Sequence, residues 1–250
     1  FETFLATNPA RLDVRRELAE THLTLDQKSI ARKVVGEMDV NHAEIENFLD
    51  VVQFMVREEF FAEAKKALEK RLGIEPEQFE LRLLLTRVFG KTGDREAAES
   101  LLNSTREIAD TPSRYRSWLE TGLEVHELFD DVALFFDREQ ARFGTTSNGG
   151  DTAEKWTAAE IEKFLILCET GERSQLTDRV TQAIRTKLLT DGLALDVRLK
   201  LRLLLITALG NQPERGAEIE EQLKLLATED PSKKDEYTLR LALLYHSLNR

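Results

Sequence analysis

The segment at residues 79–102, FELRLLLTRVFGKTGDREAAESLL, constrains the fold of this chain more than any other stretch. Its apolar residues recur at the spacing of one helical face: Leu81, Leu84, Leu85, Val88 and Phe89. The run Gly90-Lys91-Thr92-Gly93-Asp94 then interrupts the pattern, because glycine adopts the positive φ of a helix end and Asp94 can cap a following helix. The segment therefore predicts two antiparallel helices joined by a tight turn. Since such a hairpin is too narrow to enclose a core, we expect it to stack on similar units.

Similar units recur along the chain at a nearly constant period. Alanines mark the place where each predicted second helix approaches the first, at Ala31, Ala64, Ala98 and Ala133, which are 33, 34 and 35 residues apart. A hydrophobic residue follows four positions later in the first three units: Val35, Leu68 and Leu102. In the fourth unit Asp137 stands there, beside Phe135 and Phe136. Residues 201–218, LRLLLITALGNQPERGAE, match residues 81–98 at an offset of 120 and extend the repetition towards the C-terminus.

Turn, loop and helix-start signals in the sequence predict the boundaries of these units. A partial repeat at residues 1–7 is followed by four helix pairs within residues 9–143, at 9–40, 41–75, 76–110 and 111–143. Turns are expected at Leu25-Asp26 and Glu58-Glu59, and Thr111-Pro112 is a helix start signal. Residues 144–155 are rich in Gly, Ser and Thr and predict a flexible loop or linker. Either this stretch divides two domains or it is an insertion in one continuous array, and we favour the insertion.

Helical hairpins resume beyond this stretch, over residues 156–250. Thr157 is expected to begin the next pair, which turns at Gly171-Glu172. A final helix at about residues 234–248 is expected to remain unpaired. Because helix pairs fill almost the whole sequence, the chain is expected to be all-α.

The repeated unit resembles the tetratricopeptide repeat, a helix-turn-helix of about 34 residues. In that family the first helix carries Leu, a small residue and then an aromatic residue. The corresponding positions here are Leu18-Ala19 with His22, Val51-Val52 with Met55, Leu85-Thr86 with Phe89, and Leu241-Ala242 with Tyr245. The resemblance implies a right-handed superhelix, an α-solenoid of antiparallel helix hairpins with about six to seven repeats. It also implies that the first helices line a concave groove.

Composition and charge exclude several classes of function. The net charge of −11 disfavours nucleic acid and anionic lipid as partners, because the field of the protein repels phosphate. The sequence contains no apolar run long enough to predict membrane insertion. Its single cysteine, Cys168, lies on an apolar helical face and is expected to be a buried thiol. The compartment is left open, with the cytoplasm as the default, because a chain that begins with Phe1 is compatible with a removed leader or an upstream domain.

Catalytic and ligand-binding motifs are weak in this sequence. Gly90-Lys91-Thr92 imitates the end of a phosphate-binding loop, but Leu85 stands where that motif needs glycine. His126 with Asp130, and His42 with Glu46, have the four-residue spacing of metal ligands on a helix. A capping aspartate and a solvated helix face explain these pairs more simply. We therefore expect no catalytic residue, no cofactor and no metal.

The resemblance assigns the partner-binding residues to the first helices. The family's groove positions correspond to Arg16, Glu46, Gln53, Arg57, Glu80, Arg87 and Lys91. With Asp13 they form an acidic row (Asp13, Glu46, Glu80) and a more basic row (Gln53, Arg57, Arg87, Lys91). Separated rows of opposite charge would suit a partner with its own charge polarity. Ordinary solvated helix faces would look the same.

These observations favour a non-enzymatic scaffold or adaptor that binds a protein or peptide. The main alternative is a regulatory or targeting arm of a larger enzyme whose catalytic domain lies outside these residues. RNA binding is a weaker alternative, since helical repeats of other families read RNA. Self-association through end repeats is also left open.

Overall fold

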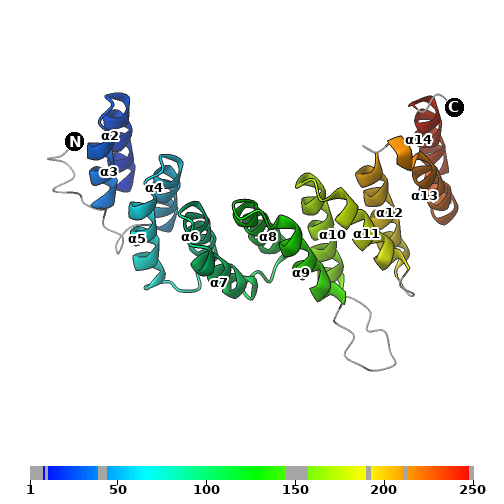
Figure 1. Cartoon of the computed structure of the whole chain (residues 1–250), viewed down its shortest axis with the longest axis horizontal. Coiled ribbons are helices and arrows are strands. Elements are labelled where there is room, and N and C mark those ends of the chain that lie inside the picture. The colour runs from blue at the N-terminus through cyan, green and yellow to red at the C-terminus, as the bar shows by residue number, and fades with distance from the viewer. Residues whose placement is uncertain are drawn as a thin grey trace, which may run out of the picture. The chain divides into compact units, whose positions relative to one another are not determined.

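The computed structural model describes residues 8, 11–38, 44–144, 157–189, 193–210 and 213–247 (Figure 1). Over these residues the chain is helical and contains no strand, so the all-α prediction is confirmed. The α-helices are α2 (Leu12–Thr24), α3 (Lys28–Gly36), α4 (Ile45–Arg57), α5 (Phe61–Leu72), α6 (Phe79–Lys91), α7 (Arg95–Arg106), α8 (Pro112–Glu127), α9 (Val132–Gly144), α10 (Ala158–Arg173), α11 (Thr177–Leu188), α12 (Leu195–Leu209), α13 (Gly216–Glu229) and α14 (Lys234–Ser247). Short 3-10 helices, Pro213–Arg215 and Pro231–Lys233, precede α13 and α14. In the described ranges, no helix has both the length and the apolar composition needed to cross a bilayer.

The chain forms two compact units. Unit 1 comprises Phe1–Asp110 and Glu124–Asp130, and unit 2 comprises Thr111–Leu123 and Asp131–Arg250. Helix α8 therefore contributes its last turn to unit 1 and its earlier turns to unit 2. Most of the stretch 144–155, which was expected to be a loop or linker, lies outside the described residues.

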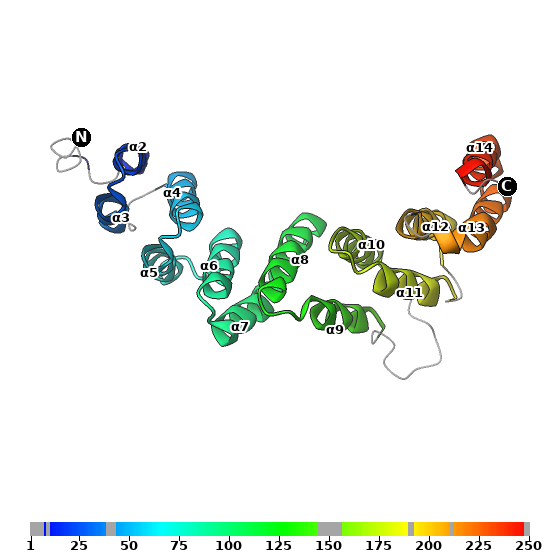
Figure 2. The ribbon, with the colours of Figure 1, turned by 45° about the horizontal axis from the view of Figure 1, so that its top comes forward.

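Within each unit the helices pack in sequence order. In unit 1, neighbouring helices from α2 to α7 contact each other, and α2 also contacts α4, α3 contacts α5 and α4 contacts α6. In unit 2 the same holds from α9 to α14, where α9 also contacts α11 and α10 contacts α12. The view in Figure 2 shows the pairs α2–α3, α4–α5 and α6–α7 of unit 1 following one another. Each helix thus packs mainly against helices that are close to it in the sequence.

Alanines recur at buried positions on the second helices of unit 1. Ala31, Ala64 and Ala98, on the second helices α3, α5 and α7, are completely buried. The apolar residues one turn further on are buried with them: Val35, Leu68 and Leu102. Alanine suits these buried positions because a larger side chain would force the packed helices apart. The positions predicted from the period of the alanines are confirmed in these three hairpins, whereas Ala133 of the fourth is only half-buried.

The turns inside the hairpins share one backbone conformation. A residue with positive φ precedes the second helix in five hairpins: Asp26, Glu59, Gly93, Asp130 and Gln175. The next residue donates its backbone N–H to the carbonyl five positions earlier, in Gln27 to His22 (2.8 Å), Phe60 to Met55 (2.7 Å), Asp94 to Phe89 (2.9 Å) and Leu176 to Gly171 (3.0 Å). This hydrogen bond closes a Schellman motif, which satisfies carbonyls at the end of the first helix.

The turn predicted over residues 90–94 is present but begins later than expected, and the turn predicted at Gly171-Glu172 is wrong in position, although both hairpins are present. Helix α6 continues through Gly90 to Lys91, and α10 continues through Gly171 to Arg173. The residue with positive φ comes later, at Gly93 and Gln175. Gly90 and Gly171 instead lie at tight side-chain contacts: a Cβ on Gly90 would lie 3.2 Å from Val125 Cγ2, and one on Gly171 would lie 2.5 Å from Phe136 Cε2. Both glycines therefore allow close packing and do not end a helix.

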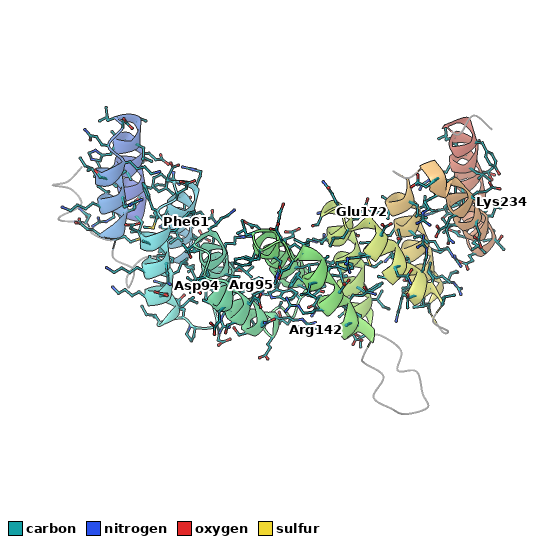
Figure 3. The ribbon with its side chains drawn as sticks, viewed as in Figure 1. Phe61, Asp94, Arg95, Arg142, Glu172 and Lys234 are labelled. Carbon is teal, nitrogen blue, oxygen red and sulfur yellow. The ribbon has the colours of Figure 1, made fainter. Side chains whose placement is uncertain are left out.

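The predicted helix starts are confirmed by their caps. Asp94 accepts a hydrogen bond of 3.3 Å from the backbone N–H of Ala97, and Figure 3 shows Asp94 beside Arg95 at the start of α7. The Thr157 hydroxyl accepts the N–H of Glu160 (3.2 Å), while the Glu160 carboxylate accepts the N–H of Thr157 (2.7 Å), which is a capping box. Thr111 likewise accepts the N–H of Arg114.

Phe135 and Phe136 of α9 are buried within unit 2. Phe135 packs against Gly122 of α8, and Phe136 packs against Gly171 of α10. Phe135 also contacts Trp118, whose ring centroid lies 5.6 Å away. The two glycines provide notches that the phenylalanine rings fill, so α9 packs against the first helix of its own hairpin and that of the next.

Candidate functional site: the first-helix face of unit 1

The predicted partner-binding residues lie on α2, α4 and α6. We call the exposed and half-exposed side chains of these helices the first-helix face; it contains Asp13, Arg16, Glu20, Glu46, Asp50, Gln53, Arg57, Glu80, Arg87 and Lys91. Asp13, Glu46 and Glu80 belong to the first turns of their helices. Carboxylates are favourable there because the N-terminus of a helix carries partial positive charge. The acidic row thus has a local structural explanation.

Helices α2 and α4 are joined across this face by ion pairs. Arg16 of α2 donates to the carboxylate of Asp50 on α4, and Arg57 of α4 lies 3.6 Å from Glu20 of α2. Arg57 also donates to Glu58 at 3.0 Å, and these carboxylates raise its pKa. Two arginines on one face therefore contact carboxylates of the neighbouring first helix.

The basic residues of α6 have the same kind of partner. Arg87 Nε donates to Glu124 Oε2 at 2.9 Å, and Lys91 Nζ lies 3.8 Å from Glu124 Oε1. Glu124 belongs to the last turns of α8, in unit 1. Two cations therefore share this single carboxylate.

Unit 2 repeats the arrangement between α8 and α10. Arg116 donates to Glu169 at 3.0 Å, and Arg173 lies 4.0 Å from Glu120. Each helix carries one arginine and one glutamate, four positions apart and in opposite order. Oppositely charged pairs between successive first helices are therefore a property of both units.

Residues of both predicted rows therefore contact side chains of opposite charge. Arg57, Arg87 and Lys91 contact glutamates of neighbouring helices or turns. In the acidic row, Asp13 accepts hydrogen bonds of 2.6 and 2.9 Å from Arg11, which lower its pKa to about 2. Exposed ion pairs contribute only about 0–1 kcal/mol each, so a charged group of a partner can replace them at little cost.

The sequence prediction missed Glu20, Asp50 and Glu124 as partners of the basic residues. A signal for them does exist. Arg16 and Asp50 are 34 residues apart, and Arg87 and Glu124 are 37 apart, which is about one repeat in each case. Opposite charges one repeat apart on first helices would have indicated these contacts.

Other candidate chemical groups have structural roles. Asp130, which follows His126 by four positions, lies in a turn with positive φ, and His42 lies outside the described residues. Cys168 is buried as expected, and burial raises the pKa of its thiol well above the ordinary value, so it is a poor nucleophile. His22 contacts Gln27 through Nδ1 at 2.7 Å beside a hairpin turn.

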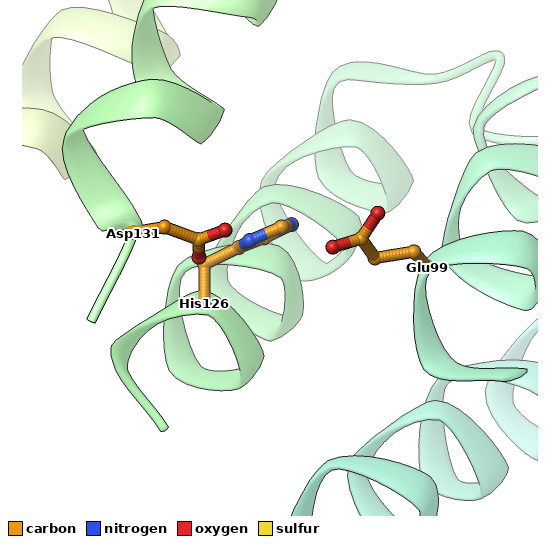
Figure 4. A group of neighbouring side chains, drawn as sticks. All are labelled: Glu99, His126 and Asp131. Atoms are coloured by element: carbon orange, nitrogen blue, oxygen red, sulfur yellow. The ribbon is translucent and has the colours of Figure 1, made fainter. Parts of the chain in front are cut away.

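Glu99 and His126, both in unit 1, bring potential metal-ligand atoms within 4.8 Å of each other (Figure 4). Asp131, also drawn in Figure 4, follows His126 by five positions and belongs to unit 2. The Glu99 carboxylate already accepts a hydrogen bond of 2.7 Å from Arg95, and His126 is buried.

No protein-family model matches the sequence, and no curated protein matches it.

Proposed function

We propose that the chain is a tetratricopeptide-like α-solenoid that acts as a scaffold or adaptor, and that the first-helix face of unit 1 binds a peptide or partner helix. The observation that carries the proposal is the regular placement of exposed charged side chains on α2, α4 and α6. These positions recur once per hairpin, so they offer a partner an ordered set of contacts. The packing of each helix against its next neighbours, and the turn shared by the hairpins, support the solenoid part of the proposal.

The charge distribution indicates what a partner must supply. At the α6 end, the cations Arg87 and Lys91 share the single carboxylate of Glu124. At the N-terminal ends of α4 and α6, Glu46 and Glu80 are exposed carboxylates. A bound peptide is therefore expected to carry an acidic side chain towards Arg87 and Lys91, and a basic one towards Glu46 or Glu80.

Peptide selection tests the proposal. A phage-displayed library of random dodecapeptides would be selected on the intact protein, and the affinities of the recovered peptides would be measured by fluorescence anisotropy. The variant R57E/R87E/K91E is expected to bind them about tenfold more weakly or worse. The matched control is R32E/K65E/R95E, which reverses three charges on the second helices α3, α5 and α7, two of them exposed and that of Lys65 half-buried.

Unchanged affinity for the control is expected, and circular dichroism would verify that both variants remain folded. An equal loss in both variants would show that binding follows net charge alone. Full binding by R57E/R87E/K91E would place the peptide away from this face. Either result contradicts the proposed binding surface.

A further inference from the structure

Glu124 is the carboxylate that Arg87 and Lys91 of the first-helix face share. It belongs to the last turn of α8, in the segment Glu124–Asp130 that is part of unit 1. Its Oε2 accepts a hydrogen bond of 2.9 Å from Arg87 Nε, and its Oε1 lies 3.8 Å from Lys91 Nζ. Among the residues that the structure describes, no other carboxylate pairs with these two cations. One acidic side chain from another helix therefore occupies both.

The other arginines of the face are held by more carboxylates. Arg16 contacts Asp50 and Glu20. Arg57 contacts Glu58 and Glu20. Each of these arginines has two acidic neighbours, whereas the two cations of α6 divide one between them. A carboxylate that a ligand brings to the α6 end therefore meets a single competitor from the protein.

The contacts of Glu124 leave donors of both cations without a protein acceptor. Arg87 donates through Nε, and none of the described residues accepts from the two terminal nitrogens of its guanidinium. A guanidinium binds a carboxylate most favourably through two parallel N–H groups. The separation of 3.8 Å between Lys91 Nζ and Glu124 is beyond hydrogen-bonding distance. Because the three side chains are between 32% and 39% exposed, a carboxylate from outside can reach these donors.

We propose that Glu124 is an internal competitor for an acidic side chain of the bound peptide. In the free protein Glu124 occupies Arg87 and Lys91, and in the complex an aspartate or glutamate of the peptide takes its place. An exposed ion pair is weak, so its exchange costs little, and the carboxylate of the peptide gains the paired N–H contact that Glu124 does not make. The proposal rests on the proposed function of the first-helix face and adds the residue that limits its affinity for acidic ligands.

Glu124→Gln tests the proposal through the sign of its effect. Glutamine keeps the size of the side chain and an acceptor oxygen for Arg87, but it removes the competing charge. The probes are the acidic dodecapeptides recovered on the intact protein, amidated at their C-termini so that only side-chain carboxylates remain. They are expected to bind E124Q about two- to fivefold more tightly in fluorescence anisotropy. If Glu124 only positions Arg87 and Lys91, removing its charge would weaken binding or leave it unchanged.

Two protein controls and one peptide control separate competition from net charge. Glu127→Gln removes the same charge from an exposed residue in the same turn of α8 and should leave the affinity unchanged. In the variant R87Q/K91Q, adding E124Q should likewise have no effect, because the shared cations are absent. Peptides whose Asp and Glu are replaced by Asn and Gln should bind E124Q and the wild type equally. Circular dichroism would verify that each variant is folded.

The outcomes distinguish this proposal from the proposed function. Unchanged or weaker binding by E124Q, an equal gain in E127Q, or a gain that persists with the amide peptides would overturn the role of Glu124 and leave the proposed function standing. Recovery of peptides that all lack acidic residues would do the same. Failure to recover any peptide from the intact protein would refute the proposed function and this proposal with it.

Discussion

Gly122 shows how a single residue sets the packing of unit 2. A Cβ at this position would lie 2.7 Å from Phe135 Cε1 and closer still to Cζ. On an exposed helix, Gly→Ala would stabilise the protein by about 1 kcal/mol. Here we expect Gly122→Ala to lower the free energy of unfolding by about 1–3 kcal/mol, because the rigid ring must move. Urea denaturation measures the change.

Phe135→Leu provides the control for this prediction. On its own it removes buried aromatic contacts and is expected to destabilise the protein. Combined with Gly122→Ala, it should cost less than the sum of the two single changes, because the smaller side chain relieves the clash. A Gly122→Ala variant more stable than the wild type would show that the notch is not filled as described.

The half-buried Lys187 makes the free energy of unfolding depend on pH. Burial lowers its pKa from 10.5 to about 8, although the nearby Glu160 partly opposes this shift. Between these values the unfolded chain binds more protons than the folded one, so the contribution of Lys187 to stability rises as pH increases from about 8 to 10.5. Below pH 8 the full penalty of burying the charge is present. We expect Lys187→Met to be more stable than the wild type at pH 7, with a smaller difference at pH 10.

Thermal unfolding of both proteins at the two pH values measures this effect. Comparing the variant with the wild type at each pH cancels the titration of other groups. A constant difference at both pH values would show that Lys187 titrates at its ordinary pKa in the folded protein.

At the scale of the element, the hairpin turn is the most regular feature. Glu59 has φ of 63° and Gly93 has φ of 78° at equivalent places in their hairpins. Glycine adopts this conformation without the clash that a Cβ brings. We therefore expect Glu59→Gly to raise the free energy of unfolding by up to about 1 kcal/mol, and Gly93→Ala to lower it by about the same amount.

Glu58→Gly is the matched control, because Glu58 has an ordinary φ of −86°. Glycine there adds only flexibility to the unfolded chain, and so it should lower stability. Equal effects of glycine at positions 58 and 59, measured by urea denaturation, would contradict the assigned turn.

The helix pairs could be predicted from the sequence, but their exact ends could not. Apolar spacing and the caps at Asp94 and Thr157 identify elements because these signals are local. The turn after α6 was started too early at Gly90, and the next was misplaced at Gly171, because glycine serves both turns and close contacts, and sequence alone does not show which neighbour approaches. Aspartate, glutamate or glutamine holds the positive φ in four of the five turns, so no glycine marks them.

The candidate site was predictable only in part for a similar reason. The first helices and their charged positions follow from the repeat. Which charges meet depends on the offset between neighbouring helices, so the pairing of Arg87 with Glu124 required the structure.

At the scale of the whole molecule, stability should be distributed in local blocks. Within each unit the helices contact mainly their next neighbours in sequence. A substitution that disrupts the packing of one helix therefore directly destabilises only the helices beside it. Ala64 is completely buried on α5, and α5 contacts α3, α4 and α6. Ala64→Leu is expected to lower local stability by about 1–3 kcal/mol through overpacking.

Hydrogen exchange measured by mass spectrometry on Ala64→Leu and the wild type tests the central claim, that the protein is a series of hairpins stabilised by their neighbours. Ala217→Leu, on the exposed side of α13, is the control and should change little. The account predicts faster exchange in α3 to α6 and wild-type rates in α10 to α13. Uniformly faster exchange throughout α10 to α13 would show one global cooperative core and would contradict the account.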